Sequence, residues 1–230
     1  MPDITINGGD GDFSAYLAAP AGGSGPGILV IQEIFGVNAD MRVHCDNFAA
    51  QGYFALSPDL FWRQEPGIQL TDKTDAEWQR AFELYQGFDV AKGMEDLIAS
   101  LSHLRGVEGC SGKTGTVGYC LGGLLAYLMA CQSDAECNVG YYGVGIDERL
   151  DQASNITAPT LLHIAEEDEY VNKEAQEAIK SGLAGHSSVA IYSYPGVNHA
   201  FTRNDGIHYD AAAAKLAHER TADAFAAALN

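Results

Sequence analysis

The sequence predicts an α/β protein with a mostly parallel, twisted sheet of about eight strands and helices on both faces. Short apolar segments alternate with amphipathic helical stretches after an antiparallel start, and this order is typical of such sheets. The chain has 230 residues, of which 47% are hydrophobic, so it can bury a substantial core. No linker, internal repeat or low-complexity tract interrupts the alternation. We therefore expect a single domain over residues 1–230.

The amino-terminal segments predict a hairpin followed by the first buried strands. Ile4–Asn7 and Phe13–Ala18 flank a turn rich in Gly and Asp. The continuous apolar run Ile28–Ile31 is typical of a strand that is buried on both faces. Asn38 is suited to cap a helix, and Gly52 is suited to end it. The next expected strand spans residues 53–56.

The rest of the chain continues the alternation. Thr74 and Glu77 have the spacing of a capping box at the start of a helix. A second helical run over residues 90–104 is expected to direct its large aliphatic side chains toward the core, namely Leu97, Ile98, Leu101 and Leu104. The remaining expected strands are Thr116–Tyr119, Val139–Tyr142, Thr160–Ile164 and Val189–Ser193, and an Ala-rich helix over 210–229 closes the chain.

Charge and cysteine usage exclude several classes of function. The 13 basic and 31 acidic residues give a formal net charge of −18, which would repel nucleic acids and anionic membrane surfaces. An anionic substrate would therefore need a local basic group. The five cysteines form no metal-binding or disulfide pattern, and the chain start does not read as a signal peptide. We expect a cytoplasmic protein that is a monomer or a weak homo-oligomer, with no metal or organic cofactor.

One motif carries nucleophilic chemistry. Residues 118–122 read Gly-Tyr-Cys-Leu-Gly, the G-x-S-x-G pattern with Cys120 in place of serine, between an expected strand and an expected helix. Such a sharp turn needs small flanking residues, and it directs the Leu121 amide at an oxyanion that forms beside the sulfur. The alternative is a small buried cysteine at a tight glycine turn. No serine in the chain has glycines two residues away on both sides.

The acid and the base are expected after later strands. His199 follows the strand at 189–193 and could act as the general base toward Cys120. Asp168 follows the strand at 160–164 and could orient His199, but three other acids lie beside it, Glu166, Glu167 and Glu169. The residues alone leave the choice of carboxylate open. We expect His163, inside a strand, to be a core residue with its hydrogen bonds satisfied.

Several blocks together resemble the dienelactone hydrolases (carboxymethylenebutenolidases), a family with the α/β-hydrolase fold. The blocks are Gln32-Glu33-Ile34-Phe35-Gly36-Val37-Asn38, Gly118-Tyr119-Cys120-Leu121-Gly122-Gly123, Gly140-Tyr141-Tyr142-Gly143 and Gly196–Phe201. The resemblance covers nearly the whole chain. It implies a triad of Cys120, Asp168 and His199.

The resemblance also implies roles that the residues alone do not reveal. Glu33 would interact with the thiol in the resting enzyme and would be displaced when substrate arrives, so that a thiolate forms only then. This arrangement would protect the thiolate from oxidation. The Ile34 amide would be the second oxyanion donor beside that of Leu121.

The substrate of the family is a small lactone that bears a carboxylate held by two arginines. Arg203 matches one of them, whereas Trp78 stands at the position of the other. Arg80 lies two residues farther along the expected helix and would face away. Phe35, Trp78 and Tyr85 are expected to contact the substrate, and an aromatic stripe of Trp78, Phe82 and Tyr85 could equally pack into the core.

The sequence therefore predicts a hydrolase that opens a small ester or lactone through an acyl-thioester intermediate. One alternative is a broader carboxylesterase or thioesterase for less polar substrates, which Trp78 favours. Two alternatives come from other classes. A thiol redox sensor at Cys120 would lack an obvious resolving cysteine, and a non-catalytic binding module would not need His199.

Overall fold

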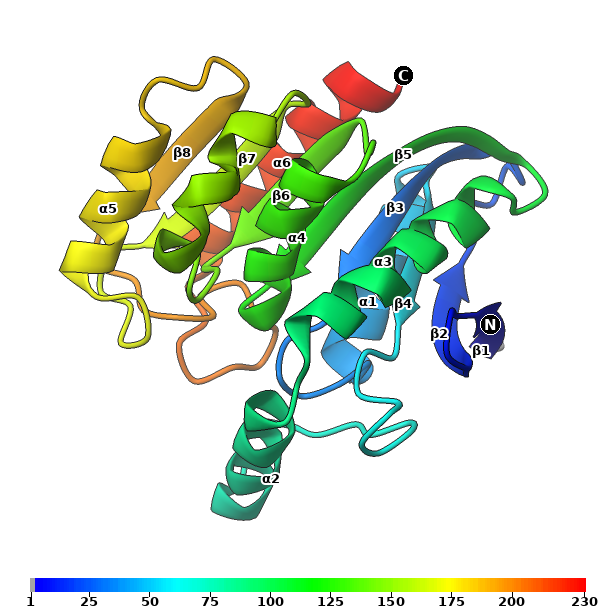
Figure 1. The fold of residues 1–230 in the computed structure, drawn as a ribbon, viewed down its shortest axis with the longest axis horizontal. Helices are drawn as coiled ribbons and strands as arrows, with labels where there is room; N and C mark the ends of the chain where they lie inside the picture. The colour runs from blue at the N-terminus through cyan, green and yellow to red at the C-terminus, as the bar shows by residue number, and fades with distance from the viewer. Residues whose placement is uncertain (1–2) are drawn as a thin grey trace. The chain divides into compact units, whose positions relative to one another are not determined.

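Eight strands form one sheet in the computed structural model, which describes residues 3–230, in the order β1-β2-β4-β3-β5-β6-β7-β8 (Figure 1). The strands are β1 (Asp3–Asn7), β2 (Asp12–Ala18), β3 (Gly25–Ile31), β4 (Phe54–Pro58), β5 (Cys110–Tyr119), β6 (Cys137–Tyr141), β7 (Thr160–Ala165) and β8 (Val189–Tyr194). The helices are α1 (Ala39–Ala50), α2 (Asp75–Gln86), α3 (Val90–Arg105), α4 (Leu121–Gln132), the 3₁₀ helix η1 (Asp147–Asn155), α5 (Lys173–Leu183) and α6 (Ala211–Leu229).

The strand directions confirm the predicted fold class. β1 pairs antiparallel with β2, and β2 pairs antiparallel with β4. The pairs β3–β4, β6–β7 and β7–β8 are parallel. The chain divides into two compact units, residues 1–115 and 116–230, which are described in turn. The expectation of a single domain stays a prediction.

In the first unit, α1 and α3 pack on the strands β3 and β4, with α3 on the near face in Figure 1. The expected cap is present, because Asn38 accepts a hydrogen bond from the amide of Met41 at 3.2 Å. Gly52 follows the end of α1 with φ of 101°, a conformation that glycine adopts at little cost. Both ends of α1 are therefore set by local sequence.

The expectation for α3 was correct for three of its four aliphatic residues. Leu97, Leu101 and Leu104 are buried, but Ile98 is 45% exposed. Each helical residue advances about 100° around the axis, so Ile98 lies one step beyond the buried stripe. The prediction that Ile98 faces the core was wrong.

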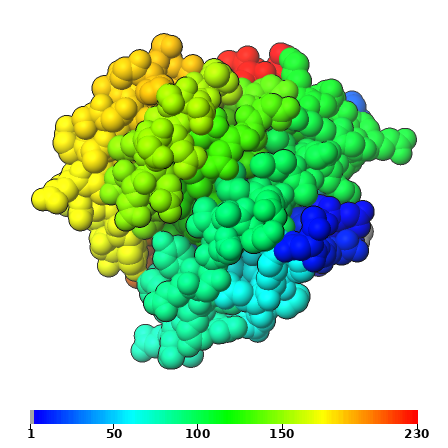
Figure 2. Space-filling view, in the orientation of Figure 1, coloured from blue at the N-terminus to red at the C-terminus, as the bar shows by residue number. Residues whose placement is uncertain are grey.

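In the second unit, α4, η1 and α5 lie on the near face of the strands and α6 lies on the far face (Figure 1). The space-filling view in the same orientation shows these near-face segments, from green to yellow, as the surface of this unit (Figure 2). α4 is buried from Leu121 through Cys131, and its sequence accordingly has no charged residue. No helix among residues 3–230 has the length and apolarity needed to cross a membrane.

β5 is longer than the sequence indicated. It starts at Cys110, six residues before the expected Thr116, and its first half alternates between exposed and half-buried residues. That half contains glycines, a serine and a lysine, which do not form the apolar run that identifies a buried strand. The buried part runs from Thr114 to Tyr119 and leads directly to Cys120.

Candidate active site

The turn between β5 and α4 has the geometry of a nucleophile elbow. Cys120 has φ of 56° and ψ of −114°, a strained backbone for a residue with a side chain. A Cβ on Gly118 would lie 1.9 Å from the carbonyl oxygen of Gly122, so no larger residue fits there. Glycine at position 118 is therefore a steric requirement of the turn.

The strained turn is held by backbone hydrogen bonds. The amide of Cys120 donates to the carbonyl of Tyr141 at 3.1 Å, which ties the elbow to the end of β6. The carbonyl of Cys120 accepts from the amide of Gly123 at 2.9 Å. Leu121 is the first residue of α4, and the first amides of a helix have no acceptor within the helix. Its N–H group is thus in the position from which such turns bind anions.

His199 and Asp168 are in direct contact. Nδ1 of His199 lies 2.9 Å from Oδ2 and 3.0 Å from Oδ1 of Asp168, and both side chains are almost fully buried. Oδ1 of Asp168 also accepts the amides of Tyr170 at 2.8 Å and Val171 at 3.1 Å. These bonds fix the carboxylate, and the carboxylate in turn orients the imidazole. Of the four acids in this loop, Asp168 is the one paired with His199.

Cys120 affects the charge state of the same imidazole. Burial by itself would lower the pKa of His199, but the charge of Cys120 and the hydrogen bonds that the imidazole makes to Asp168 and Cys120 outweigh burial and raise this pKa to about 10. Nε2 of His199 is buried and has no well-aligned hydrogen bond within residues 3–230. The arrangement therefore favours a protonated His199 imidazole.

Strained backbone conformations, with positive φ, occur at and beside these residues. Four residues other than glycine have positive φ among those that the structure describes. Cys120 is one, Ala200 follows His199 with φ of 59°, and Tyr142 follows β6 with φ of 39°. Tyr142 contacts the imidazole of His199, with ring centroids 4.9 Å apart. Strained backbone is common where side chains are held for function.

Arg203 lies in the loop that carries His199. Its side chain is buried, with 7% of the residue exposed, and its amide donates to the carbonyl of Ala200 at 3.0 Å. Its positive charge acts on the hydroxyl of Tyr170, whose ring contacts His199 at 4.8 Å between centroids. The second unit thus places a buried cation near the Cys120, Asp168 and His199 group.

The other predicted residues belong to the first unit. Glu33, Ile34 and Phe35 follow β3 and are buried. The ring of Phe35 packs edge-on against Trp78 at 5.0 Å, and Trp78 stacks on Phe82 at 5.6 Å. The indole N–H of Trp78 donates to the carbonyl of Asp72 at 3.1 Å.

Tyr85 lies on α2 and is half-buried. The aromatic stripe of α2 therefore has a packing role at Trp78 and Phe82, and Phe35 joins this cluster. Arg80 on the same helix is bound to two carboxylates: it reaches Glu65 at 2.7 Å and Glu83 at 2.9 Å. These two ion pairs hold the Arg80 guanidinium at the surface of α2.

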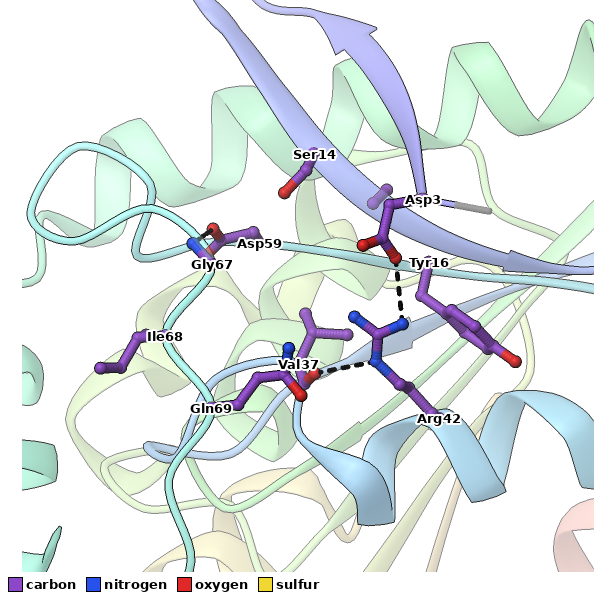
Figure 3. Close-up of a pocket in the computed structure, with 10 residues that line it drawn as sticks. Asp3, Ser14, Tyr16, Val37, Arg42, Asp59, Gly67, Ile68 and Gln69 are labelled. Carbon is purple, nitrogen blue, oxygen red and sulfur yellow. Dashed lines mark hydrogen bonds and ion pairs between the residues drawn. The ribbon is translucent and has the colours of Figure 1, made fainter. Parts of the chain in front are cut away.

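A small cavity of about 40 Å³ lies elsewhere in the first unit (Figure 3). Arg42 borders it and donates to Asp3 at 3.0 Å and to the carbonyl of Val37 at 3.4 Å. Asp59 accepts the amide of Gly67 at 2.7 Å. None of the predicted site residues lines this cavity.

A family model matches residues 13–229 and is described as the dienelactone hydrolase family. The chain belongs to the dienelactone hydrolase family. It is therefore a hydrolase of the carboxymethylenebutenolidase type, which acts on a carboxylic ester bond.

Individual relatives agree over the full length. A protein of Azospirillum brasilense named "Putative carboxymethylenebutenolidase" is 50% identical, and the match covers 98% of each chain. The carboxymethylenebutenolidase of Pseudomonas putida is 38% identical over 96% of this chain and 94% of its own. A solved structure, "Crystal Structure of Putative Dienelactone Hydrolase from Klebsiella pneumoniae", is 27% identical with a TM-score of 0.87 and covers 98% of this chain and 97% of that chain.

Tyr142 and Tyr170 also contact His199, and neither contact was predicted from the sequence. Tyr142 lay at the end of an expected strand, and Tyr170 lay two residues after Asp168. Their contacts with His199 join segments far apart in the chain, and neither position has a pattern of its own. The position of each after a parallel strand was the one available signal.

Proposed function

We propose that the chain opens a small lactone or ester by a Cys120, His199 and Asp168 triad, through an acyl-thioester intermediate. The observation that supports this most directly is the buried Asp168–His199 pair, on whose imidazole Cys120 acts. An acid, a base and a nucleophile that act on one another are the requirement for nucleophilic catalysis. The elbow geometry at Cys120 supports the same role.

In the proposed reaction, the Cys120 thiolate attacks the carbonyl carbon and a carbon–sulfur bond forms. The ring C–O bond of the lactone then breaks, and the leaving oxygen departs as an enolate that needs little acid assistance. The imidazolium of His199 gives its proton to the released enolate. The neutral His199 then takes a proton from water, the hydroxide cleaves the thioester, and the thiolate and the imidazolium are regenerated. The Leu121 amide would bind the oxyanion together with the Ile34 amide. Glu33 would control the thiol before substrate binds.

The substrate that this proposal favours carries a carboxylate. With a net charge of −18 the protein repels anions, so a buried cation near the triad is significant. Arg203 would bind the carboxylate, and Phe35, Trp78 and Tyr85 would bind the apolar part of the substrate. A second candidate is an esterase or thioesterase for less polar substrates, which the aromatic cluster at Trp78 favours.

The nucleophile is tested by the hydrolysis of a dienelactone and of aryl esters. Cys120→Ala should abolish the turnover of both. Cys110→Ala is a matched control, because Cys110 is a half-buried free thiol at the start of β5, the strand that leads to Cys120. Equal rates for the wild type and Cys120→Ala would remove Cys120 from the mechanism.

The substrate class is tested by comparing an acidic lactone with its methyl ester. Arg203→Met should raise KM for the acid and leave KM for the methyl ester nearly unchanged, because only the acid has a charge to bind. Equal preference for the two substrates in the wild type would favour the second candidate. Thermal unfolding of Arg203→Met checks that its fold is retained.

The free state of all five cysteines supports a reducing compartment such as the cytoplasm. We further propose that the protein acts as a monomer or a weak homo-oligomer on small molecules alone. Sedimentation velocity over a range of protein concentrations measures the oligomeric state. A stable oligomer at every concentration would contradict this part of the proposal.

A further inference from the structure

Two tyrosine rings contact the imidazole of His199. Tyr142 meets it at 4.9 Å between centroids with an interplanar angle of 62°, and Tyr170 meets it at 4.8 Å with an angle of 76°. Both pairs have the edge-to-face geometry that aromatic rings prefer. The two tyrosines come from different loops, one after β6 and the other after β7.

Tyr142 is fixed at both ends. Its amide donates to the carbonyl of His163 at 2.8 Å, and its backbone has the positive φ of 39° noted above. Its hydroxyl lies 2.9 Å from the hydroxyl of Thr202, which belongs to the same loop as His199. A tyrosine with positive φ is rare, and this one is 2% exposed. The strain therefore holds a buried ring against the imidazole.

Tyr170 approaches from the solvent side and is 41% exposed. Its amide donates to Oδ1 of Asp168, so the carboxylate that orients His199 also anchors this tyrosine. Burial raises the pKa of the Tyr170 hydroxyl, the charges of Glu169 and Cys120 raise it further, and Arg203 lowers it. The hydroxyl thus lies within the electrostatic reach of the triad.

We propose that Tyr142 and Tyr170 are positioning residues that hold the His199 ring so that Nε2 faces Cys120. The proposal rests on the triad proposed above. Asp168 binds His199 at Nδ1 only, and a ring held at one atom can still tilt about that bond. Two edge-to-face contacts restrict the tilt, and small errors of position are costly in catalysis.

The same rings are close enough to act on the charge of the imidazole. A cation within about 6 Å of an aromatic centroid is attracted by the ring, and both tyrosines satisfy this distance. Other groups that face or adjoin His199 also act on its charge. The two tyrosines therefore make a smaller change to an electrostatic environment that is set mainly by these groups. These groups are Cys120 from the elbow, Asp168 from the loop after β7, and Arg203 and His208 from its own loop.

Tyr170 offers the cleaner test because its exposed side chain can be replaced with little risk to folding. Tyr170→Leu removes the ring, whereas Tyr170→Phe keeps the ring and removes the hydroxyl. Tyr170→Leu should lower kcat about tenfold or more and leave KM within a factor of two. Tyr170→Phe should restore most of kcat. A raised KM with unchanged kcat in Tyr170→Leu would show a substrate contact and would overturn the positioning role.

A second measurement does not depend on hydrolysis. The titration of His199 by NMR, assigned by comparison with His199→Gln, should show a pKa lowered by about half a unit in Tyr170→Leu. The rate of Cys120 alkylation by iodoacetamide depends on pH, and in Tyr170→Leu this dependence should shift toward lower pH, as the His199 pKa does. A His199 pKa equal to that of the wild type in both Tyr170→Leu and Tyr142→Leu would overturn the proposal. If the wild type hydrolyses no ester, the triad proposal fails while these titrations still test the ring contacts.

Tyr142 is tested with the same pair of changes. Tyr142→Phe keeps the ring but loses the Thr202 contact, and it should retain the His199 pKa with a modest loss of kcat. Tyr142→Leu should lower both the His199 pKa and kcat, as we expect for Tyr170→Leu. Thermal unfolding identifies a variant that has lost its fold, and in that case the Tyr142→Phe and Tyr170 results decide. Equal kcat loss in Tyr142→Phe and Tyr142→Leu would assign the role to the hydroxyl and contradict the proposal.

Discussion

Asp168 binds the Nδ1 side of His199 with both carboxylate oxygens, at 2.9 and 3.0 Å, and both residues are almost completely buried. The pair joins the loops that follow β7 and β8, 31 residues apart in the chain. This relationship separates Asp168 from the three acids that surround it. It also leaves Nε2 as the one imidazole nitrogen available for proton transfer.

The first prediction concerns this pair. Asp168→Asn should lower kcat by about 10³- to 10⁴-fold, because the neutral amide no longer stabilises the protonated imidazole or its correct tautomer. KM should change little. Steady-state kinetics on an aryl ester measures both constants. Glu167→Gln is the control, since Glu167 is exposed in the same loop and pairs with Lys173. An equal loss in the control would contradict the assignment of Asp168.

The elbow gives a prediction about stability. Gly118→Ala places a Cβ 1.9 Å from a backbone oxygen that cannot move away, so it should destabilise the protein by about 1–3 kcal/mol and abolish activity. Gly185→Ala is a matched control with open space around the new Cβ, and it should be neutral or stabilising by up to about 1 kcal/mol. Chemical denaturation compares the two. Similar stability of both variants would mean that the turn tolerates a side chain.

His163 predicts a pH dependence of stability. It is buried in the core, where it bonds the hydroxyls of Tyr194 and Thr221, and burial lowers its pKa to about 3. The unfolded chain takes up a proton near pH 6.5 while the folded chain does not. His163 therefore contributes stability above about pH 6.5 that is lost as the pH falls toward 3.

The slope of this loss is measurable. Between those pH values His163 should contribute about 1.4 kcal/mol per pH unit to the free energy of unfolding. Denaturation at several pH values should show a flatter profile for His163→Gln than for the wild type. Because the carboxylates titrate in both proteins, the difference between the profiles isolates this histidine. Parallel profiles would mean that His163 is protonated in the folded state.

Arg80 and Trp78 give a prediction about specificity. Arg80 is bound to Glu65 and Glu83, so Arg80→Ala should leave KM for an acidic lactone unchanged. Trp78→Arg would restore the charge that the family resemblance implies at this position, and it should lower KM for the acid but not for its methyl ester. Initial rates over a range of substrate concentrations give these values. A higher KM for the acid in Arg80→Ala would show that Arg80 leaves its carboxylates to bind substrate.

Much of the fold could be predicted from local patterns. The hairpin, the cap at Asn38 and the buried half of β5 follow from turn residues, capping side chains and apolar runs, which act over a few neighbours. The first half of β5 and the exposed side of Ile98 could not be predicted this way. Both depend on which surface the neighbouring elements cover, and this is a property of the assembled sheet.

The candidate site also has features that the sequence predicted and features that depend on tertiary structure. The order of Cys120, Asp168 and His199 after three strands followed from the chain itself, and so did the need for glycine at position 118. The residues alone left the carboxylate open, and the family resemblance implied Asp168. The contact between His199 and Asp168 and the ring contacts of Tyr142 and Tyr170 are visible only in the tertiary structure. Distances of 3–5 Å between side chains depend on how strands and loops pack, because residues far apart in sequence meet only after the chain has folded.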